Sequence, residues 1–291
     1  MKAHSATDTL SRRRFFRSGL LGTTGLVAAA ALPPSSLLAG PTKTPRDNFN
    51  GLKFGMASYT LRSFDLDHAI AMTKQVGVKY ICLKDMHLPL KSDEAQCQEA
   101  ARKIEAAGLV LVGGGVIYMK NAAEVQNSFA YAKRAGMRSI TCSPDPTVLD
   151  LVETAAKEHD ILVAIHNHGP TDKKYPSPRD VLRLVKDRDP RMGICMDVGH
   201  TVRIGEDPVE VIHDCGKRLL DFHFKDVTTA TASGKPTEVG QGIIDIVGVL
   251  KALKELNYAH YVNLEYEANG DNPMPGVIES YAFIRGALAA I

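Results

Sequence analysis

Short apolar runs rich in β-branched residues alternate along the chain with longer stretches whose apolar residues recur at helical spacing. The short runs predict eight strands, at residues 54–61, 80–87, 109–119, 138–145, 161–169, 192–200, 219–227 and 261–267. The longer stretches predict helices at residues 65–76, 92–107, 121–135, 147–158, 178–188, 207–217, 245–256 and 276–290. Regular alternation with short connections favours an α/β fold of the (β/α)8 TIM barrel type, formed as a single domain.

An open, doubly wound sheet is the main alternative for this alternation. The nucleotide-binding version of that sheet carries a glycine-rich phosphate loop after its first strand, and no such loop follows residues 54–61. Gly113, Gly114 and Gly115 lie inside the third predicted strand, where they indicate a bend or a close approach in the barrel wall. The closed barrel is therefore the better prediction.

The first residues of the chain follow a different pattern. Arg12, Arg13 and Arg14 precede an uncharged run at residues 18–31, which is typical of a twin-arginine export signal. A disordered basic tail would explain the arginines but not the apolar run, which is short for a membrane span. We expect a signal at residues 1–40, a linker at 41–50 and the barrel at 51–291. The protein is then expected to be periplasmic or exported, without membrane attachment once the signal is removed.

Charge and cysteine content exclude two classes of function. The formal net charge is +2, so the chain offers no electrostatic footprint for nucleic acid as a partner. The five cysteines are an odd number, and Cys82, Cys142 and Cys195 lie in apolar runs where buried thiols are usual. We therefore expect neither a disulfide framework nor a zinc knuckle. The oligomeric state is not readable, because the apolar face of residues 276–290 is needed to close the barrel.

In a TIM barrel the chemistry lies at the carboxyl ends of the strands. Apolar residues dominate the predicted strand starts, whereas the ends carry the ionisable residues Lys84, Asp85, His166, His168, Asp197, His200, His223, Lys225, Asp226, Glu265 and Glu267. Taken singly, each has a structural alternative, such as Asp226 capping the seventh loop or His200 bonding a backbone carbonyl. Together, a carboxylate, a histidine and a second carboxylate on three consecutive strands predict a divalent-metal site with nitrogen and oxygen ligands.

Two histidines separated by one residue end the fifth predicted strand. Side chains two apart on a strand point to the same face, so His166 and His168 are both expected to face the barrel mouth. One buried histidine is usually a satisfied core residue, but a pair on one face indicates a ligand. The metal site is therefore expected to extend to this strand.

Four short motifs resemble those of a known family. They read MDVGH at 196–200, HFKD at 223–226, GQG at 240–242 and LEYE at 264–267. In this order they resemble the sugar phosphate isomerase/epimerase family, which has a xylose isomerase-like TIM barrel. The resemblance spans essentially all of residues 51–291, and each motif alone is only a weak signal.

The resemblance implies a metal held by a Glu, an Asp, a His and a Glu on strands five to eight. By motif position the last three correspond to Asp197, His223 and Glu265. The family pattern on strand five is apolar-Glu-Asn-His, whereas this chain has His166 in the place of the Glu. The predicted metal ligands are His166, Asp197, His223 and Glu265. A nitrogen ligand favours Mn²⁺, Co²⁺ or Zn²⁺ over Mg²⁺, which prefers oxygen.

The implied chemistry acts on a ketone with a neighbouring hydroxyl, through an enediolate that the metal stabilises. Return of the proton to the sugar gives isomerisation or epimerisation, and loss of a β-oxygen gives dehydration. The predicted catalytic residues are Glu265, Glu267, His168 and Lys84, with His168 or Glu267 as the base. His200 and Lys225, together with Lys84, are expected to hold oxygens of a small sugar substrate.

Three other functions remain open. A hydratase or lyase acting on a keto-sugar, such as a 3-keto-glucose derivative, would use the same site, and the missing strand-five Glu favours it. An endonuclease IV-like hydrolase would need further ligands on the early strands, where the chain offers only His87. A sugar-binding protein without catalysis would not need so many ionisable groups. The sequence leaves the sugar itself undetermined.

Overall fold

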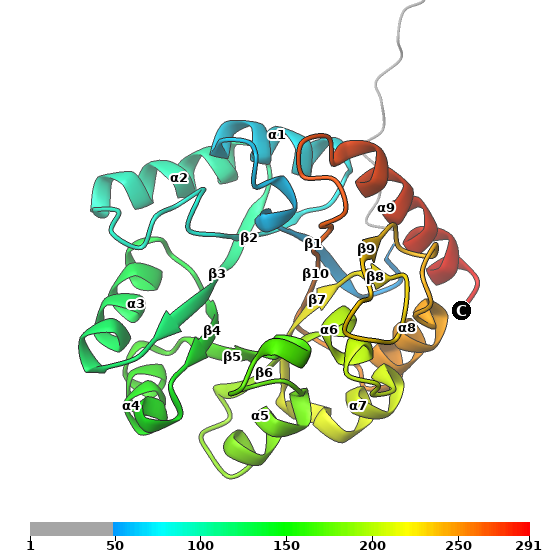
Figure 1. Cartoon of the computed structure of the whole chain (residues 1–291). Coiled ribbons are helices and arrows are strands. Elements are labelled where there is room, and N and C mark those ends of the chain that lie inside the picture. The colour runs from blue at the N-terminus through cyan, green and yellow to red at the C-terminus, as the bar shows by residue number, and fades with distance from the viewer. Residues whose placement is uncertain (1–48) are drawn as a thin grey trace, which may run out of the picture. The chain divides into compact units, whose positions relative to one another are not determined.

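The computed structural model describes residues 49–291, which form one closed barrel of eight parallel strands (Figure 1). The predicted export signal and the first part of the predicted linker lie outside the described residues. Phe49, which we assigned to the linker, is buried and its ring stacks on that of Phe54 with 4.8 Å between centroids. Packing of the barrel core therefore includes Phe49.

The predicted (β/α)8 fold is confirmed by the strand order. Around the barrel the order is β1-β10-β7-β6-β5-β4-β3-β2, which follows the chain from strand to strand and closes between β1 and β10. The eight strands are β1 (Lys53–Ala57), β2 (Tyr80–Leu83), β3 (Val110–Met119), β4 (Ser139–Pro144), β5 (Leu162–His166), β6 (Met192–Asp197), β7 (Leu219–Phe224) and β10 (Tyr261–Leu264). The short strands β8 (Asp226–Val227) and β9 (Pro236–Thr237) form a separate antiparallel pair after β7.

Helices follow the strands and form the outer layer of the barrel (Figure 1). They are α1 (Leu66–Gln75), α2 (Glu94–Ala106), α3 (Ala122–Arg134), α4 (Leu149–His159), α5 (Pro178–Val185), α6 (Val198–Arg203), α7 (Pro208–Cys215), α8 (Ile246–Glu255) and α9 (Met274–Ala289). Short 3-10 turns lie at η1 (Ser58–Leu61), η2 (Pro146–Val148), η3 (Gly169–Thr171) and η4 (Gly216–Arg218). Ser177 and Asp207 cap α5 and α7 by accepting bonds from backbone N–H groups, which fixes where these helices begin.

Several strands end earlier than the apolar pattern predicts. The sixth was expected to reach His200, but β6 ends at Asp197 and α6 begins at Val198. The cause is local, because the Asp197 carboxylate accepts a 2.8 Å hydrogen bond from the backbone N–H of His200 and so caps a helical turn. Likewise β5 ends at His166, so His168 lies in the loop beyond the strand.

The glycines of β3 make the close approach that their position predicts. A Cβ on Gly113 would lie 2.5 Å from Ser139 Oγ, and one on Gly115 would lie 1.9 Å from the carbonyl oxygen of Thr141. Any side chain there would force β3 away from β4. The glycines therefore serve the barrel wall and form no phosphate loop, as expected.

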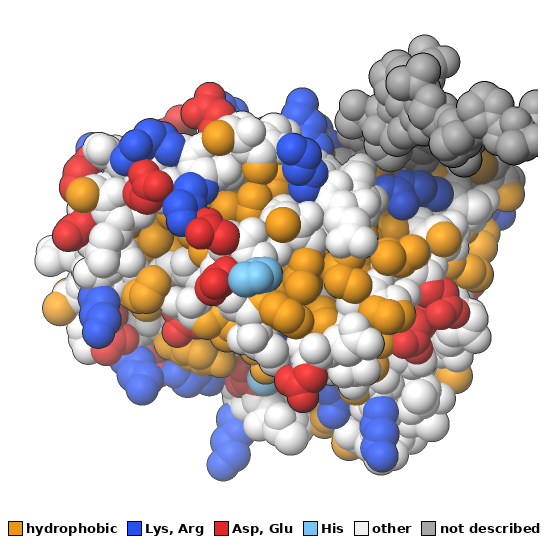
Figure 2. Space-filling model, turned by 90° about the horizontal axis from the view of Figure 1, so that it is seen from above, with side chains coloured by type: hydrophobic (Ala, Val, Ile, Leu, Met, Phe, Trp, Pro, Cys, Tyr) orange, Lys and Arg blue, Asp and Glu red, His pale blue; other side chains and the backbone are white. Residues whose placement is uncertain are grey.

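The outer face over α1, α2 and α9 mixes hydrophobic side chains with charges of both signs (Figure 2). No single sign of charge dominates this view, which agrees with the small net charge. Within residues 49–291, no helix combines the length and the apolar character that a membrane crossing needs.

Candidate active site

Four buried side chains converge at the carboxyl end of the barrel. They are the predicted metal ligands His166 at the end of β5, Asp197 at the end of β6, His223 in β7, and Glu265 directly after β10. One donor atom from each lies within 4.8 Å of the others, and we call this set the four-donor cluster. Because β5, β6, β7 and β10 are consecutive in the barrel, their ends meet at one side of the mouth.

The distances between donor atoms suit a single ion. His223 Nδ1 lies 3.2 Å from His166 Nε2 and 3.2 Å from Glu265 Oε2. Asp197 Oδ2 lies 3.5 Å from His166 Nε2 and 4.0 Å from His223 Nδ1. Two ligands that each bind a transition metal at about 2.1 Å stand roughly 3 to 3.5 Å apart. The spacing in the cluster is close to this value.

Asp197 is held in place so that one oxygen faces the cluster. Its Oδ1 is held by the N–H of His200, and its own N–H donates to Asn167 Oδ1 at 2.7 Å. The other oxygen, Oδ2, lies 3.5 Å from His166 Nε2, and the residue is completely buried. A buried carboxylate needs a positive charge nearby. The two imidazoles and two carboxylates of the cluster fit a divalent ion with mixed nitrogen and oxygen ligands.

Lys225 brings a positive charge into this cluster. Its Nζ lies 2.9 Å from Asp197 Oδ2 and 2.8 Å from Glu265 Oε2, and it donates a hydrogen bond to Glu267. The Lys225 side chain is itself buried. This ammonium group therefore contacts two of the predicted ligands and one further carboxylate, and its single charge leaves an excess of negative charge that suits a cation.

Burial and neighbouring charges set the protonation of the cluster. Burial lowers the pKa of His166 to about 4, so this imidazole is neutral and able to bind a metal. Burial also disfavours charge on Asp197 and Glu265, but Lys225 and the adjacent histidines outweigh it and hold both carboxyl pKa values well below their usual range. Burial opposes charge on His223 as well, yet the Glu265 carboxylate outweighs it and raises the pKa of His223.

The two remaining predicted histidines lie beside the cluster rather than in it. The His168 ring is exposed, 5.7 Å from the His166 ring and 4.6 Å from the His200 ring between centroids. His200 is carried by α6, and burial lowers its pKa to about 4. Its Nδ1 has no hydrogen-bond partner within the described chain. This nitrogen is buried beside Gly169, so the predicted contact of His200 with a substrate hydroxyl stays a prediction.

Lys84 and His87, which follow β2, are not part of the four-donor cluster. Lys84 follows β2, and its Nζ lies 5.3 Å from the centre of the Tyr59 ring. Lys84 shares no ion pair with the cluster in the described residues. His87, considered as an extra ligand for an endonuclease-like site, points its Nδ1 to Ser58 Oγ at 2.9 Å and is not part of the cluster. The early strands therefore add no metal ligand here.

Asp226 has a structural role, in the loop after β7, and lies outside the four-donor cluster. Its carboxylate accepts hydrogen bonds from the backbone N–H groups of Val227, Gly240, Gly242 and Ile244. A Cβ on Gly242 would lie 2.1 Å from Asp226 Oδ1, so only glycine allows the backbone to come this close. The HFKD and GQG motifs are thus connected, and Asp226 anchors the loop after β7 instead of facing the mouth.

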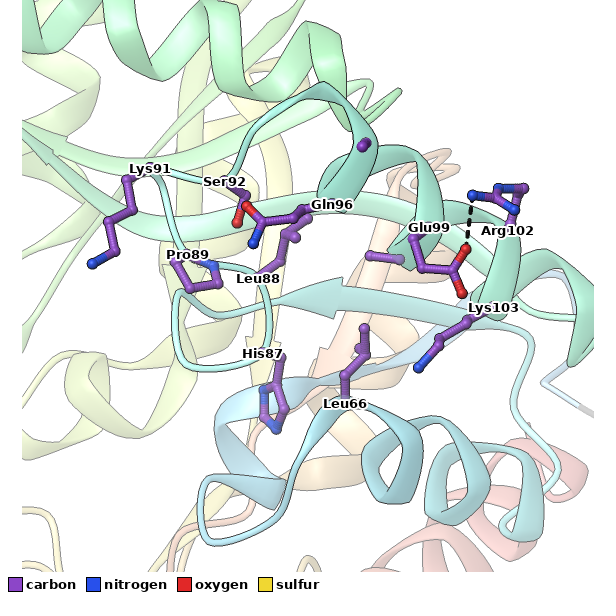
Figure 3. A pocket seen from close by; sticks show the side chains of 12 residues that line it. Leu66, His87, Leu88, Pro89, Lys91, Ser92, Gln96, Glu99, Arg102 and Lys103 are labelled. Atoms are coloured by element: carbon purple, nitrogen blue, oxygen red, sulfur yellow. Dashed lines mark ion pairs between the residues drawn. The ribbon is translucent and has the colours of Figure 1, made fainter.

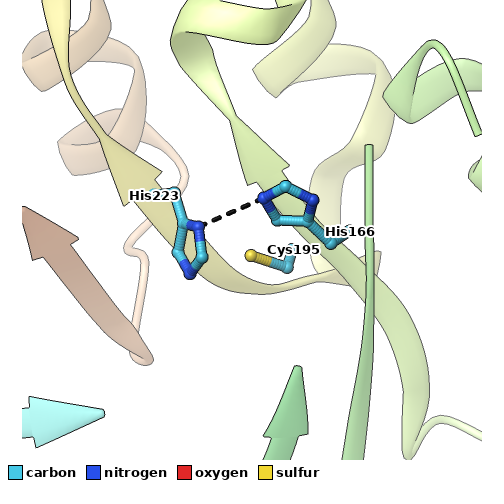
Figure 4. Close-up of side chains that lie close together, drawn as sticks. All are labelled: His166, Cys195 and His223. Atoms are coloured by element: carbon cyan, nitrogen blue, oxygen red, sulfur yellow. Dashed lines mark hydrogen bonds between the residues drawn. The ribbon is translucent and has the colours of Figure 1, made fainter. Parts of the chain in front are cut away.

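Cys195 is a site residue that the sequence reasoning missed. It lies on β6 two residues before Asp197, and its thiol forms a second possible ligand group with His166 and His223 (Figure 4). We treated it as a core thiol because it sits in an apolar run. Its spacing of two from Asp197 was the available signal, since both side chains then point into the barrel.

A larger hollow lies away from the cluster. It has a volume of about 590 Å³ and is lined by the loop after β2 together with α1 and α2 (Figure 3). None of the four donors lines it. A smaller pocket of about 300 Å³ opens beside His168 and includes Tyr118 and Ser143. Of these two pockets, only the smaller is lined by a predicted catalytic residue, His168.

Comparisons with known proteins agree with this geometry. A family model described as xylose isomerase-like TIM barrel matches residues 147–287, which include the whole four-donor cluster. An inosose dehydratase from Lacticaseibacillus casei is 27% identical over 136 residues, which is 42% of this chain and 45% of that protein. The chain thus spans about half the length of the curated relatives it matches.

Solved structures extend the likeness to the whole barrel. An uncharacterised protein from Parabacteroides distasonis is 25% identical, with a TM-score of 0.65 over 81% of this chain and 99% of that chain. The 3-keto-D-glucoside 4-epimerase from E. coli has a TM-score of 0.66 at 16% identity, over 81% and 99% of the two chains. The barrel topology and these likenesses together show that the described chain is a (β/α)8 TIM barrel similar to the xylose isomerase-like TIM barrels.

Proposed function

We propose that the protein is a divalent-metal-dependent isomerase or epimerase that acts on a sugar or keto-sugar. The observation that carries this proposal is the four-donor cluster at the barrel mouth, where two imidazoles and two carboxylates converge. An ion held by His166, Asp197, His223 and Glu265 would act as a Lewis acid toward a substrate carbonyl and its neighbouring hydroxyl. Mn²⁺, Co²⁺ or Zn²⁺ suits the two imidazoles better than Mg²⁺.

The other mouth residues supply proton transfer and substrate contacts. His168 is exposed beside the cluster, so it can reach a proton on a carbon next to the carbonyl. Glu267 is the alternative base, and its hydrogen bond from Lys225 keeps the carboxylate oriented. His200 is partly exposed and lies beside the cluster, where its ring can bond a hydroxyl, and Lys84 can donate to an oxygen farther out.

Dehydration of a keto-sugar is the second candidate, and two observations favour it. The curated relatives are named inosose dehydratases, although the match covers only about half the length of each relative. In addition, the neutral His166 stands where a second carboxylate base would be needed to exchange a proton on both faces of a sugar. Loss of water needs one base and one acid, and the exposed His168 can supply the base.

Proton exchange into solvent tests the proposal and separates the two reactions. The barrel would be loaded with Mn²⁺, Co²⁺ or Zn²⁺ and incubated with free ketoses and keto-glycosides in heavy water, with products followed by NMR. Isomerisation or epimerisation incorporates deuterium and conserves the formula, whereas dehydration also forms a conjugated ketone that absorbs in the ultraviolet. His168→Asn and Glu267→Gln identify the base. Absence of exchange with every ketone at full metal loading would overturn the enzymatic proposal.

We also propose that the protein is exported, on the basis of residues 12–16 and the uncharged run after them. Changing Arg12 and Arg13 to lysine in the full chain should retain the protein in the cytoplasm, while Arg46→Lys, which lies after the predicted signal, leaves export intact. Cell fractionation and immunoblotting measure the distribution. Equal export of the two variants would contradict this proposal.

A further inference from the structure

A pocket beside the four-donor cluster has the features of a binding site. It is lined by side chains that include Tyr118, Ser143, His168, Thr171, Lys173 and Lys174, and we call it the mouth pocket. Its volume of about 300 Å³ is at the lower end of the range for small-molecule sites. Because its walls come from the ends of β3 and β4 and the loop after β5, it opens on the same side of the barrel as the cluster.

His168 connects the mouth pocket to the cluster. Its ring lies 5.7 Å from that of His166, and the same residue lines the mouth pocket. A sugar whose carbonyl is held at the cluster would therefore extend past His168. Any group joined to that sugar on this side would enter the mouth pocket.

Tyr118 gives the mouth pocket an aromatic wall. It is 58% exposed, whereas the large aromatic residues Tyr131, Tyr175 and Tyr281 are fully buried in the core. Tyr118 stands opposite Ser143 in the β3–β4 register, which places an apolar ring beside a hydroxyl group. Aromatic rings with a few polar groups are the usual lining of ligand sites.

The lysines supply donors for hydroxyl groups. Lys174 is occupied, because its Nζ pairs with Asp145 Oδ2 at 2.9 Å. Lys173 is exposed and forms no ion pair with any residue in the described part of the chain. The mouth pocket thus offers an aromatic face for the C–H side of a sugar ring together with free donors for its hydroxyls.

We propose that the mouth pocket binds a second sugar ring, so that the substrate is a keto-glycoside or keto-disaccharide rather than a free monosaccharide. This inference rests on the proposed function of the neighbouring cluster. It adds the size of the substrate and assigns Tyr118 as a residue that determines specificity.

The test compares disaccharides with a monosaccharide in the metal-loaded barrel. Calorimetry with cellobiose, trehalose and D-glucose would be run on wild type, Tyr118→Ala and Tyr118→Phe. We expect at least one disaccharide to bind about tenfold more tightly than glucose. Tyr118→Ala should abolish this preference without changing glucose binding, and Tyr118→Phe should keep it because the ring face remains. Circular dichroism controls for folding, which an exposed side chain should not affect.

The outcomes separate the two proposals. Equal affinity for glucose and both disaccharides, or a preference that survives Tyr118→Ala, would overturn the second-ring subsite. The proposed function stands in that case if free ketoses still exchange a proton. If no sugar binds and no ketone exchanges, both proposals fail.

Discussion

Replacing Lys225 by methionine tests how the charges of the cluster are balanced. Lys225 is the buried ammonium that contacts Asp197, Glu265 and Glu267, and the side chains of Lys225, Asp197 and Glu265 are all less than a tenth exposed. Methionine keeps most of the apolar stem and removes only the charge. Taking away one partner of a buried ion pair costs about 3 to 5 kcal/mol, because the other charge stays buried without compensation. For a barrel of this size, that free energy corresponds to a fall in melting temperature of roughly 10 °C.

The assay is thermal and urea unfolding of the protein after treatment with a chelator. Lys103→Met is the matched control, because Lys103 also contacts a carboxylate at 2.7 Å and 2.8 Å, but its pair with Asp67 lies on the surface. The control should lose much less stability than Lys225→Met, because water screens a surface ion pair. Adding Mn²⁺, Co²⁺ or Zn²⁺ should stabilise Lys225→Met more than wild type, since the ion supplies the missing positive charge. If the chelated Lys225→Met protein is no less stable than Lys103→Met, this account of the cluster is wrong.

Three further predictions concern single positions. His166→Glu restores an oxygen ligand and should shift metal preference from Zn²⁺ toward Mn²⁺ and Mg²⁺, as competition dialysis would measure; an unchanged preference would contradict His166 as a ligand. Burial lowers the pKa of His166 to about 4, so below pH 6.5 this residue is protonated in the unfolded chain but stays neutral in the folded protein. The free energy of unfolding therefore decreases as the pH is lowered. From pH 7 to pH 5 this decrease in unfolding free energy is about 2 kcal/mol for the metal-free protein. Urea unfolding at the two pH values should show a decrease that is smaller by about 2 kcal/mol in His166→Asn. Asp226→Ala leaves four backbone N–H groups without their acceptor and should open residues 228–244 to limited proteolysis, with Asp245→Ala as the control; equal cleavage of the two variants would argue against the anchor.

The barrel was predictable because its signals are local and repeat along the chain. Apolar runs of strand length alternate with stretches of helical period, and caps such as Ser177 and Asp207 mark the helix starts. The four donors were predictable for a related reason, since consecutive strand ends of a parallel barrel must meet. Neither inference requires knowledge of a side-chain conformation.

The contacts of individual side chains and the positions of short helices could not be predicted in this way. Lys225 and Asp226 are adjacent, yet one enters the cluster and the other anchors a loop, and only the three-dimensional packing decides between them. The helix α6 has six residues, which is too short to show a period, so His200 was placed on a strand. Tyr118 shares a pocket with Ser143 and the loop after β5, which are distant from it in sequence.

The metal content of the purified protein tests the central claim most directly. Wild type, Glu265→Ala and the surface control Glu255→Ala would be reloaded, dialysed exhaustively and analysed by elemental mass spectrometry. The account predicts roughly one equivalent of Mn, Co or Zn in wild type and in the control, and loss of the metal in Glu265→Ala. Wild-type protein that retains no metal after reloading, or Glu265→Ala protein that retains a full equivalent, would contradict the four-donor cluster as a metal centre.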